Sequence, residues 1–177
     1  MWQRNLYAAW FAQILSITGF GFVLPFVPFY IQELGVTDPE RLRMWTGVLS
    51  SAPALSMGIM APVWGVIADR VGKKLMMLRA MLFGSIIMGL MSMAQSVQTV
   101  LILRVAQGLF TGTITASGAL VATGTPKERL SYALGFLSSA TFIGISVGPM
   151  VGVIAAENLG YRISFLMGAG MLPFGFS

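Results

Sequence analysis

The sequence lacks both cysteine and histidine, and charged residues make up only 10% of its 177 positions. The missing thiols and imidazoles exclude disulfides, thiol nucleophiles, Ser–His dyads and the usual zinc and haem ligands. A soluble globular domain carries about 25% charged residues, so this chain has too few charges to cover a surface that faces water. We therefore expect neither a soluble fold nor a metal or other cofactor.

The sequence contains long apolar runs, and hydrophobic residues make up 56% of it. A helix needs roughly 20 mostly apolar residues to cross a bilayer. The predicted fold is an all-α integral membrane bundle in which residues 1–177 form one transmembrane unit. Five complete spans and a sixth, incomplete one are expected over approximately residues 6–31, 45–68, 75–95, 97–122, 130–156 and 162–177.

The basic residues, which give the chain a net charge of +5, are divided unevenly between the two sides of the predicted membrane. The side of the N-terminus holds seven, namely Arg4, Arg70, Lys73, Lys74, Arg79, Lys127 and Arg129. The other side holds three, namely Arg41, Arg43 and Arg162. Because basic loops stay in the cytoplasm, we predict a multi-pass cell-membrane protein with a cytoplasmic N-terminus. The expected partner of the bases is then the lipid bilayer and not nucleic acid.

A short repeat indicates internal symmetry. The segments 69–74 and 157–162 both have the pattern acid-x-x-Gly-x-base, and they lie 88 residues apart on opposite faces of the predicted membrane. Two inverted three-helix repeats, a common plan of secondary transporters, would produce this arrangement.

The link between the second and third spans is the most distinctive segment. An acid stands at the end of a helix, a glycine permits a sharp turn, and bases follow. Its residues are Gly65, Asp69, Arg70, Gly72, Lys73 and Lys74. On physical grounds alone, Asp69 can also be a simple counter-ion in a basic loop.

The fourth span contains an arginine well inside the predicted membrane. Arg104 is followed by Gln107 about one turn later, and Gly108 and Gly112 form a GxxxG step. An ionisable residue at such depth is costly and is a functional hypothesis by default. The alternative is that the side chain of Arg104 extends to the membrane interface.

Two further motifs combine glycine with proline. In the fifth span Gly144, Gly148 and Gly152 form one stripe beside Pro149, which bends the helix. We expect this stripe to pack against a helix that is absent from the chain, and hence to be an exposed groove here. In the first span a second motif with two prolines permits a bend near its outer end. That motif consists of Gly19, Pro25 and Pro28.

Together these motifs resemble the major facilitator superfamily, in particular its twelve-helix drug/proton antiporters. Segment 65–74 is similar to the signature G-x-L-A-D-R-x-G-R-K, with Ile67 and Lys73 as departures. The fourth span is similar to the pattern R-x-x-Q-G, and Gly19, Pro25 and Pro28 follow the spacing of a first-span element. The fifth span is similar to the antiporter motif, apart from a valine at its last position.

The resemblance implies the N-terminal half of a transporter that exports lipophilic, cationic drugs in exchange for protons by alternating access. In the family, Asp69 and Arg70 would belong to an inward-side gate, and Arg104 would take part in proton coupling. The missing C-terminal half is then an expected partner, with a small-molecule substrate and protons. A metabolite or sugar exporter of the same superfamily is the alternative, followed by a non-transporting scaffold or a membrane-embedded enzyme.

The predicted spans contain no acidic residue that could carry the exchanged proton. The carrier would then be Asp69 or a group in the missing half, unless the coupling is of another kind. The same lack of a carboxylate pair, with the lack of histidine and cysteine, leaves an enzyme without the groups for acid–base or metal chemistry.

Overall fold

The computed structural model describes residues 2–21, 25 and 27–171, and these residues contain helices but no β-strand. The side chains at 113–115, 157, 159 and 171 lie outside the description, as do positions 22–24, 26 and 172–177 of the predicted first and sixth spans. The elements in chain order are α1 (Trp2–Gly21), α2 (Val27–Glu33), α3 (Pro39–Val71), α4 (Lys73–Ser92), α5 (Val97–Phe110), α6 (Thr113–Gly124), η2 (Lys127–Arg129), α7 (Leu130–Leu159) and α8 (Tyr161–Met171).

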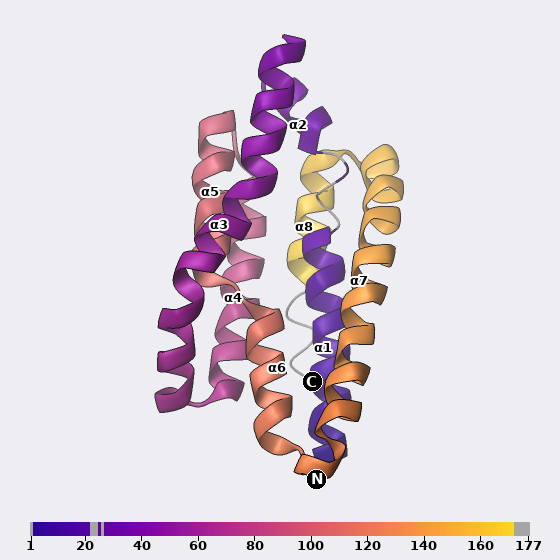
Figure 1. Cartoon of the computed structure of the whole chain (residues 1–177). Coiled ribbons are helices and arrows are strands. Elements are labelled where there is room, and N and C mark those ends of the chain that lie inside the picture. Colours follow the sequence, from indigo (N-terminus) through magenta and orange to yellow (C-terminus); the bar gives the residue numbers. More distant parts are fainter. Residues whose placement is uncertain (1, 22–24, 26, 172–177) are drawn as a thin grey trace.

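The helices run up and down along one long axis (Figure 1). The start of α1 lies at the same end as the α3–α4 turn and the link between α6 and α7, and we call this the basic end. The links α2–α3, α4–α5 and α7–α8 lie at the opposite end, which we call the far end. This alternation is the path of a chain that crosses a layer repeatedly.

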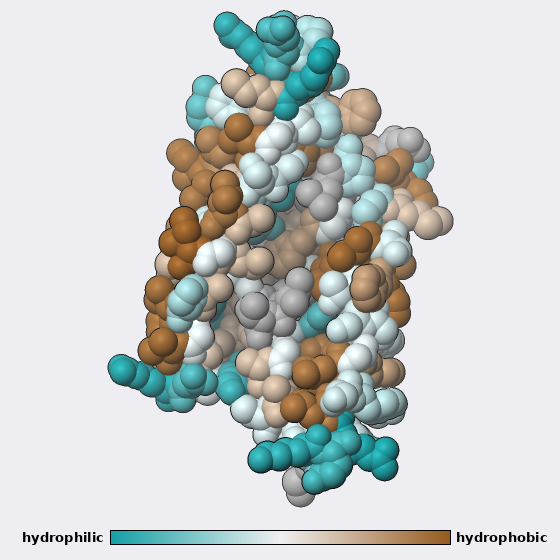
Figure 2. All heavy atoms as spheres, in the orientation of Figure 1, coloured by the Kyte–Doolittle hydropathy of each residue, from teal (hydrophilic) through white to brown (hydrophobic). Residues whose placement is uncertain are grey.

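On the face that Figure 2 shows, hydrophobic residues gather along the two flanks of the bundle and hydrophilic residues gather at both ends. Large side chains such as Leu55, Ile59 and Phe142 are 68–73% exposed. Water would not favour such a surface, whereas lipid tails solvate it. Among the described residues, three helical stretches are long and apolar enough to cross a membrane, namely Pro39–Val71, Lys73–Ser92 and Lys127–Ala156.

The fourth span is broken, so the prediction of one helix over 97–122 is wrong. α5 ends at Phe110, and α6 begins after Gly112, whose φ is +145°. L-residues rarely adopt such a φ, whereas glycine does so readily. The amide of Thr111 closes α5 by donating to the Gln107 carbonyl at 2.9 Å. The apolar pattern continues across the break, which is why the sequence did not reveal it.

In the described part of the first span, α1 ends at Gly21, Pro25 lies outside both α-helices, and α2 begins at Val27. The prediction of one helix over 6–31 is therefore also corrected. Pro25 and Pro28 explain the division, since proline donates no backbone hydrogen bond and clashes with the preceding helical turn. Spans one and four hold corresponding positions in the two predicted repeats, so the breaks are related by the same symmetry.

The ends of α3 and α4 differ from the predicted spans 45–68 and 75–95. α3 begins at Pro39, because Asp38 accepts a hydrogen bond from the Arg41 amide at 3.2 Å and proline suits a first helical position. At the basic end, Gly72 (φ +102°) reverses the chain in one residue. Lys73 therefore starts α4 instead of lying in a loop.

Helix packing shows the inverted repeat more clearly than the sequence did. α1 packs against α7, and α5 packs against α3. The first contact joins spans one and five, and the second joins spans four and two. If spans one to three are exchanged with spans four to six, the first pair therefore becomes the second. Gly21 faces Gly144 across the first contact, and Gly108 faces Ser56 across the second. Gly21 and Gly108 are 87 residues apart, and Ser56 and Gly144 are 88 apart, which matches the spacing of the two loop segments.

The glycine stripe of the fifth span packs inside this chain, so the prediction of an exposed groove is wrong. Gly144, Gly148 and Gly152 are all buried. A Cβ atom on Gly144 would lie 2.7 Å from the Ile17 Cβ, and one on Gly148 would lie 2.9 Å from the Thr18 carbonyl oxygen. The stripe meets α1 because its missing side chains let two helix backbones approach closely.

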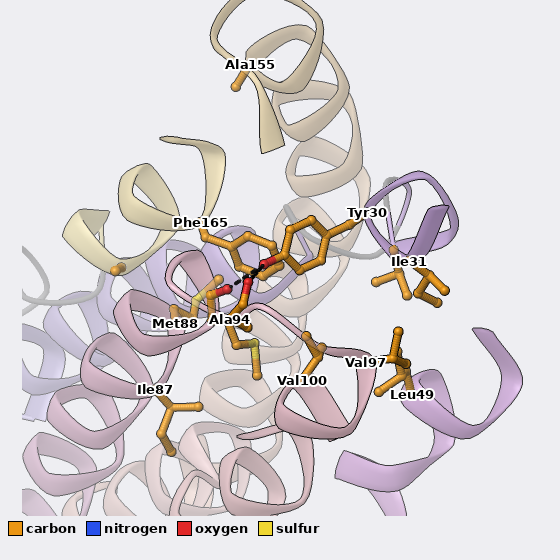
Figure 3. Close-up of a cluster of buried hydrophobic side chains, with 13 residues drawn as sticks. Tyr30, Ile31, Leu49, Ile87, Met88, Ala94, Val97, Val100, Ala155 and Phe165 are labelled. Carbon is orange, nitrogen blue, oxygen red and sulfur yellow. Dashed lines mark hydrogen bonds between the residues drawn. The ribbon is translucent and has the colours of Figure 1, made fainter. Parts of the chain in front are cut away.

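A buried apolar cluster joins the helices near the far end (Figure 3). The Tyr30 hydroxyl of α2 donates to the Met91 carbonyl at 2.9 Å and lies 3.2 Å from the Ala94 carbonyl. These carbonyls belong to the end of α4 and the turn after it, where the helix leaves acceptors without intrahelical donors. The Tyr30 ring also packs on Phe165 of α8, with 5.1 Å between ring centroids. This contact fixes the short α2 beside the third and sixth spans.

Candidate functional site

A cavity of about 300 Å³ lies where the two broken spans meet, and we call it the central cavity. Its volume is at the lower end of the range of small-molecule sites. Transporter sites often form beside interrupted helices, where backbone groups and helix ends face the ligand. The wall consists of Ile17, Phe20, Gly21, Ser50, Pro53, Ala54, Met57, Arg104, Gln107, Gly108, Thr111, Gly112 and Ile145.

Arg104 is the one charged side chain among these wall residues, and it is 4% exposed. Its Nη1 donates to Oε1 of Gln107 at 3.2 Å, as residues three apart on one helix face can do. Its Nε and Nη2 atoms are buried and have no hydrogen-bond partner among the described residues. Two donor atoms of the guanidinium are therefore unpaired within the described part of the chain, and protein covers both of them.

The burial of Arg104 argues against the alternative in which its side chain reaches the membrane interface. Such a side chain would lie along the surface with an exposed guanidinium, whereas this one is enclosed by helices. A guanidinium keeps its proton at physiological pH. Arg104 thus gives the central cavity a permanent positive charge in a region where charge is costly.

A second polar group, which the sequence analysis missed, links α1 to α6 and α7. Gln13 is 2% exposed, and its Nε2 donates to the Thr141 hydroxyl at 2.7 Å. Its Oε1 accepts a hydrogen bond from Ser117. Gln13 is the one amide side chain in the segment 6–31, and this is the sequence signal that could have drawn attention to it. These hydrogen bonds connect the first span to the fourth and fifth spans.

A second cavity, of about 270 Å³, lies nearer the basic end between α3, α4 and α6. The guanidinium carbon of Arg79 lies 3.3 Å from the centroid of a Trp64 ring. Trp64 in turn donates from Nε1 to the Leu109 carbonyl at 2.6 Å, close to the break in the fourth span. Sequence reasoning treated Arg79 only as a base that sets topology. Its cation–π contact required knowledge of the α3–α4 packing.

The motif at the α3–α4 turn lies at the surface of the basic end. Asp69 pairs with Lys73 at 3.6 Å and not with Arg70, and the Asp69 side chain is 73% exposed. Water therefore reaches most of the Asp69 carboxylate. Arg70, Gly72 and Lys74 are exposed as well. A Cβ atom on Gly65 would meet no atom within 4 Å, so that glycine has open space beside it.

The predicted site residues therefore separate into different places. Arg104, Gln107 and Gly108 share the central cavity, while the α3–α4 motif lies at the basic end. Gly144, Gly148 and Gly152 lie at the α1–α7 contact, where the Pro149 ring approaches Gly21. The first-span motif also lies outside the wall of the central cavity. Its Gly19 is buried, and Pro25 and Pro28 are half-buried.

The described residues offer no group of three acidic side chains that could hold a metal ion. Their ion pairs, Asp38 with Arg41 and Asp69 with Lys73, involve exposed acids at the helix ends. The side chains at the central cavity offer a positive charge, hydrogen-bonding groups and apolar surface.

Comparison with known proteins agrees with this architecture. The family model of the Major Facilitator Superfamily matches residues 9–177. The chain is 42% identical over 171 residues to the multidrug resistance protein MdtG of Proteus mirabilis (strain HI4320). It is 43% identical to the protein of that name from Serratia proteamaculans (strain 568) and 42% identical to the one from Escherichia coli O1:K1 / APEC.

These alignments include 97% of this chain but only 42% of each of the three relatives. The chain therefore spans less than half the length of the curated relatives that it matches. The family match, however, runs through nearly all of it. With its broken spans, inverted packing symmetry and lipid-facing surface, the chain belongs to the major facilitator superfamily.

Proposed function

We propose that this chain forms the N-terminal half of a secondary active transporter that exports lipophilic compounds in exchange for protons. The observation that carries the proposal is the central cavity, which lies between both broken spans and has the buried Arg104 in its wall. The relatives named multidrug resistance proteins support drugs as the exported compounds. Alternating access would then move this half against a second one around the cavity.

The glycine contacts give this half the rigidity that such movement requires. Gly108 allows α5 to pack closely against α3, and Gly144 and Gly148 allow α7 to pack closely against α1. Because packed interfaces do not deform continuously, the six spans of this half would move as one body. The proton would be carried by Asp69 or by a group in the second half, since the other acids of this chain also stand at helix ends or in links.

The proposed location is the inner or plasma membrane, with the basic end in the cytoplasm. We predict that a topology reporter fused after Lys74 or Arg129 reports the cytoplasm, because basic links are retained there. A reporter fused after Pro39 or Asn158 should report the outside. Alkaline phosphatase and green fluorescent protein fusions give opposite readouts at each point. The reversed pattern would contradict the proposed orientation.

Asp69 is proposed to favour the outward-open state through contact with the second half. Its exposed pair with Lys73 contributes at most about 1 kcal/mol, whereas a carboxylate at a partly buried helix N-terminus contributes up to about 2 kcal/mol. Asp69→Asn should therefore lower export by up to about 30-fold and leave the melting temperature unchanged. Labelling of a cysteine introduced at Pro25 should also fall, because the far end would spend less time open.

The control for this prediction is Glu128→Gln, which removes another exposed acid at the basic end. It should change neither export nor labelling. If Asp69→Asn behaved in the same way, Asp69 would be no more than a counter-ion of Lys73.

A drug-susceptibility panel on cells that express the full-length protein tests the proposed function. We expect lower susceptibility to several lipophilic drugs, and a protonophore should abolish the difference. A metabolite or sugar exporter would leave the panel unchanged and would instead raise the concentration of its own substrate in the medium. That outcome would replace drug export by the alternative within the same superfamily.

A further inference from the structure

We propose that Trp64 is a positioning residue of the central cavity, because it fixes the end of α5 and thereby the orientation of Arg104 and Gln107. The inference rests on the export function proposed above, since it concerns the site assigned to that function. Trp64 itself lines the second cavity and lies outside the wall of the central one. It would therefore act on the site through the backbone of α5.

The first argument is the hydrogen bond at the break of the fourth span. Leu109 is the last residue but one of α5, and the final carbonyls of a helix have no donors within it. Such a carbonyl is costly inside a membrane. In an unbroken helix the amide four residues later would pair with it, but Gly112 (φ +145°) interrupts the helix. The Trp64 indole supplies the donor instead, with 2.6 Å between its Nε1 and the Leu109 oxygen.

The second argument is the group that holds the indole in place. The guanidinium carbon of Arg79, on α4, lies 3.3 Å from the centroid of a Trp64 ring. A cation on an aromatic face is attracted more strongly where water is excluded, and Nε and Nη1 of Arg79 are buried. The indole also brings this positive charge near the C-terminal end of α5, which carries a partial negative charge. The ring of Trp64 is thus held between α4 and the end of α5.

The third argument is a separate contact at the same helix end. Phe83, one turn after Arg79 on α4, stacks on Phe110, the last residue of α5, with 5.2 Å between ring centroids. α3 and α4 therefore hold two successive residues at the end of α5. Arg104 and Gln107 lie within the last two turns of this helix. A displacement of its end would therefore move both side chains in the cavity wall.

The alternative is that Trp64 only anchors the bundle at the membrane interface, where tryptophan is enriched. An anchoring indole directs its N–H toward water or lipid head groups. Trp64 lies seven residues before the end of α3, about 10 Å along the helix, and its N–H bonds to protein backbone. An anchor would leave α5 and the central cavity unaffected, so the two roles predict different results.

Hydrogen–deuterium exchange of the purified full-length protein tests the inference at residues 104–112. Trp64→Phe keeps a ring beside Arg79 and removes the N–H. We expect the amides at the end of α5 to exchange at least about fivefold faster, the smallest factor for a buried acceptor that loses its donor. The matched control is Trp10→Phe, which removes a bond of 2.9 Å from Nε1 to the Ser139 hydroxyl and should leave these amides unchanged. Unchanged exchange with Trp64→Phe would overturn the inference.

A second variant tests the same contact without altering the tryptophan. Arg79→Gln removes the cation from the ring and should also speed exchange at the end of α5. Arg79→Lys should keep most of the protection, because an ammonium also binds an aromatic face. Unchanged exchange with Arg79→Gln would show that the indole is not held in this way and would overturn the inference.

The consequence for transport is measured as export of ethidium from energised cells. Trp64→Phe should raise KM at least about fivefold, since it would misplace the cavity wall, while Trp10→Phe should not. In an Arg104→Lys background Trp64→Phe should lower the rate no further, because residues that act through one group are not additive. An equal fall in both backgrounds would overturn the inference, since Trp64 would then act independently of Arg104.

The two measurements separate this inference from the proposed function. Exchange is measured without transport, so a wild-type protein that exports no drug would contradict the proposed function alone. Normal export by Trp64→Phe, despite faster exchange at the end of α5, would contradict this inference alone.

Discussion

Replacement of Gly108 by alanine should lower the free energy of unfolding by about 1–3 kcal/mol, the usual effect of overpacking. A Cβ atom at this position would overlap the Ser56 side chain and the Pro53 carbonyl, and it would lie 2.9 Å from the carbonyl carbon of Pro53. The backbone of α3 cannot move away without disturbing Leu49 and Ala52, which are buried on the same helix. α5 and α3 would have to separate.

The expected change in melting temperature is a decrease of about 2–12 °C, measured on the purified protein by its loss of monodispersity on heating. Gly108→Leu should leave little folded protein. Gly89→Ala is the matched control, because Gly89 lies inside α4 with nothing within 4 Å of an added Cβ. That substitution should be neutral or slightly stabilising, since alanine favours a helix. Equal effects at the two positions would contradict the close contact between α3 and α5.

Replacement of Arg104 by lysine should impair export as strongly as replacement by alanine, while expression and melting temperature stay near those of the wild type. A guanidinium can bond to Gln107 and still present two further donor nitrogens in a fixed plane. An ammonium has a single nitrogen and cannot reproduce that arrangement. Loss of one charge-assisted contact costs about 1.5–3 kcal/mol, which predicts roughly a 10- to 150-fold lower rate.

The two substitutions distinguish a substrate-binding arginine from one that only needs a positive charge. If Arg104 acted through its charge alone, lysine would preserve export and alanine would not. Initial rates of export from energised cells measure this directly, with protein amounts normalised by immunoblot. Wild-type rates in the lysine variant would contradict the role assigned to the guanidinium fork.

The transmembrane architecture was accessible from the sequence because it depends on composition and length. Runs without charge predicted a bundle of long apolar helices, and a single glycine predicted the turn at 72. The depth of Arg104 in its span also predicted a buried charge. These features depend on residues that are close in the sequence, so they can be predicted without knowing which helices pack together.

What the sequence could not predict depends on contacts between distant segments. The break at Gly112 looked like one more packing glycine, because apolar residues continue on both sides. The stripe through Gly148 was correctly expected to pack closely, but its partner proved to be α1 of the same half. The bond from Trp64 to the Leu109 carbonyl depends on how α3 lies against α5.

Reconstitution of the full-length protein into liposomes tests directly whether it exchanges drugs for protons through the cavity at Arg104. A pH gradient is imposed across the membrane, and the accumulation of a fluorescent lipophilic drug is followed in vesicles with the cytoplasmic side outward. We expect the drug to accumulate when the interior is acidic, to be released on addition of a protonophore, and not to accumulate with Arg104→Gln. Accumulation that is equal with and without the gradient, or that persists in Arg104→Gln, would contradict proton-driven export through this cavity.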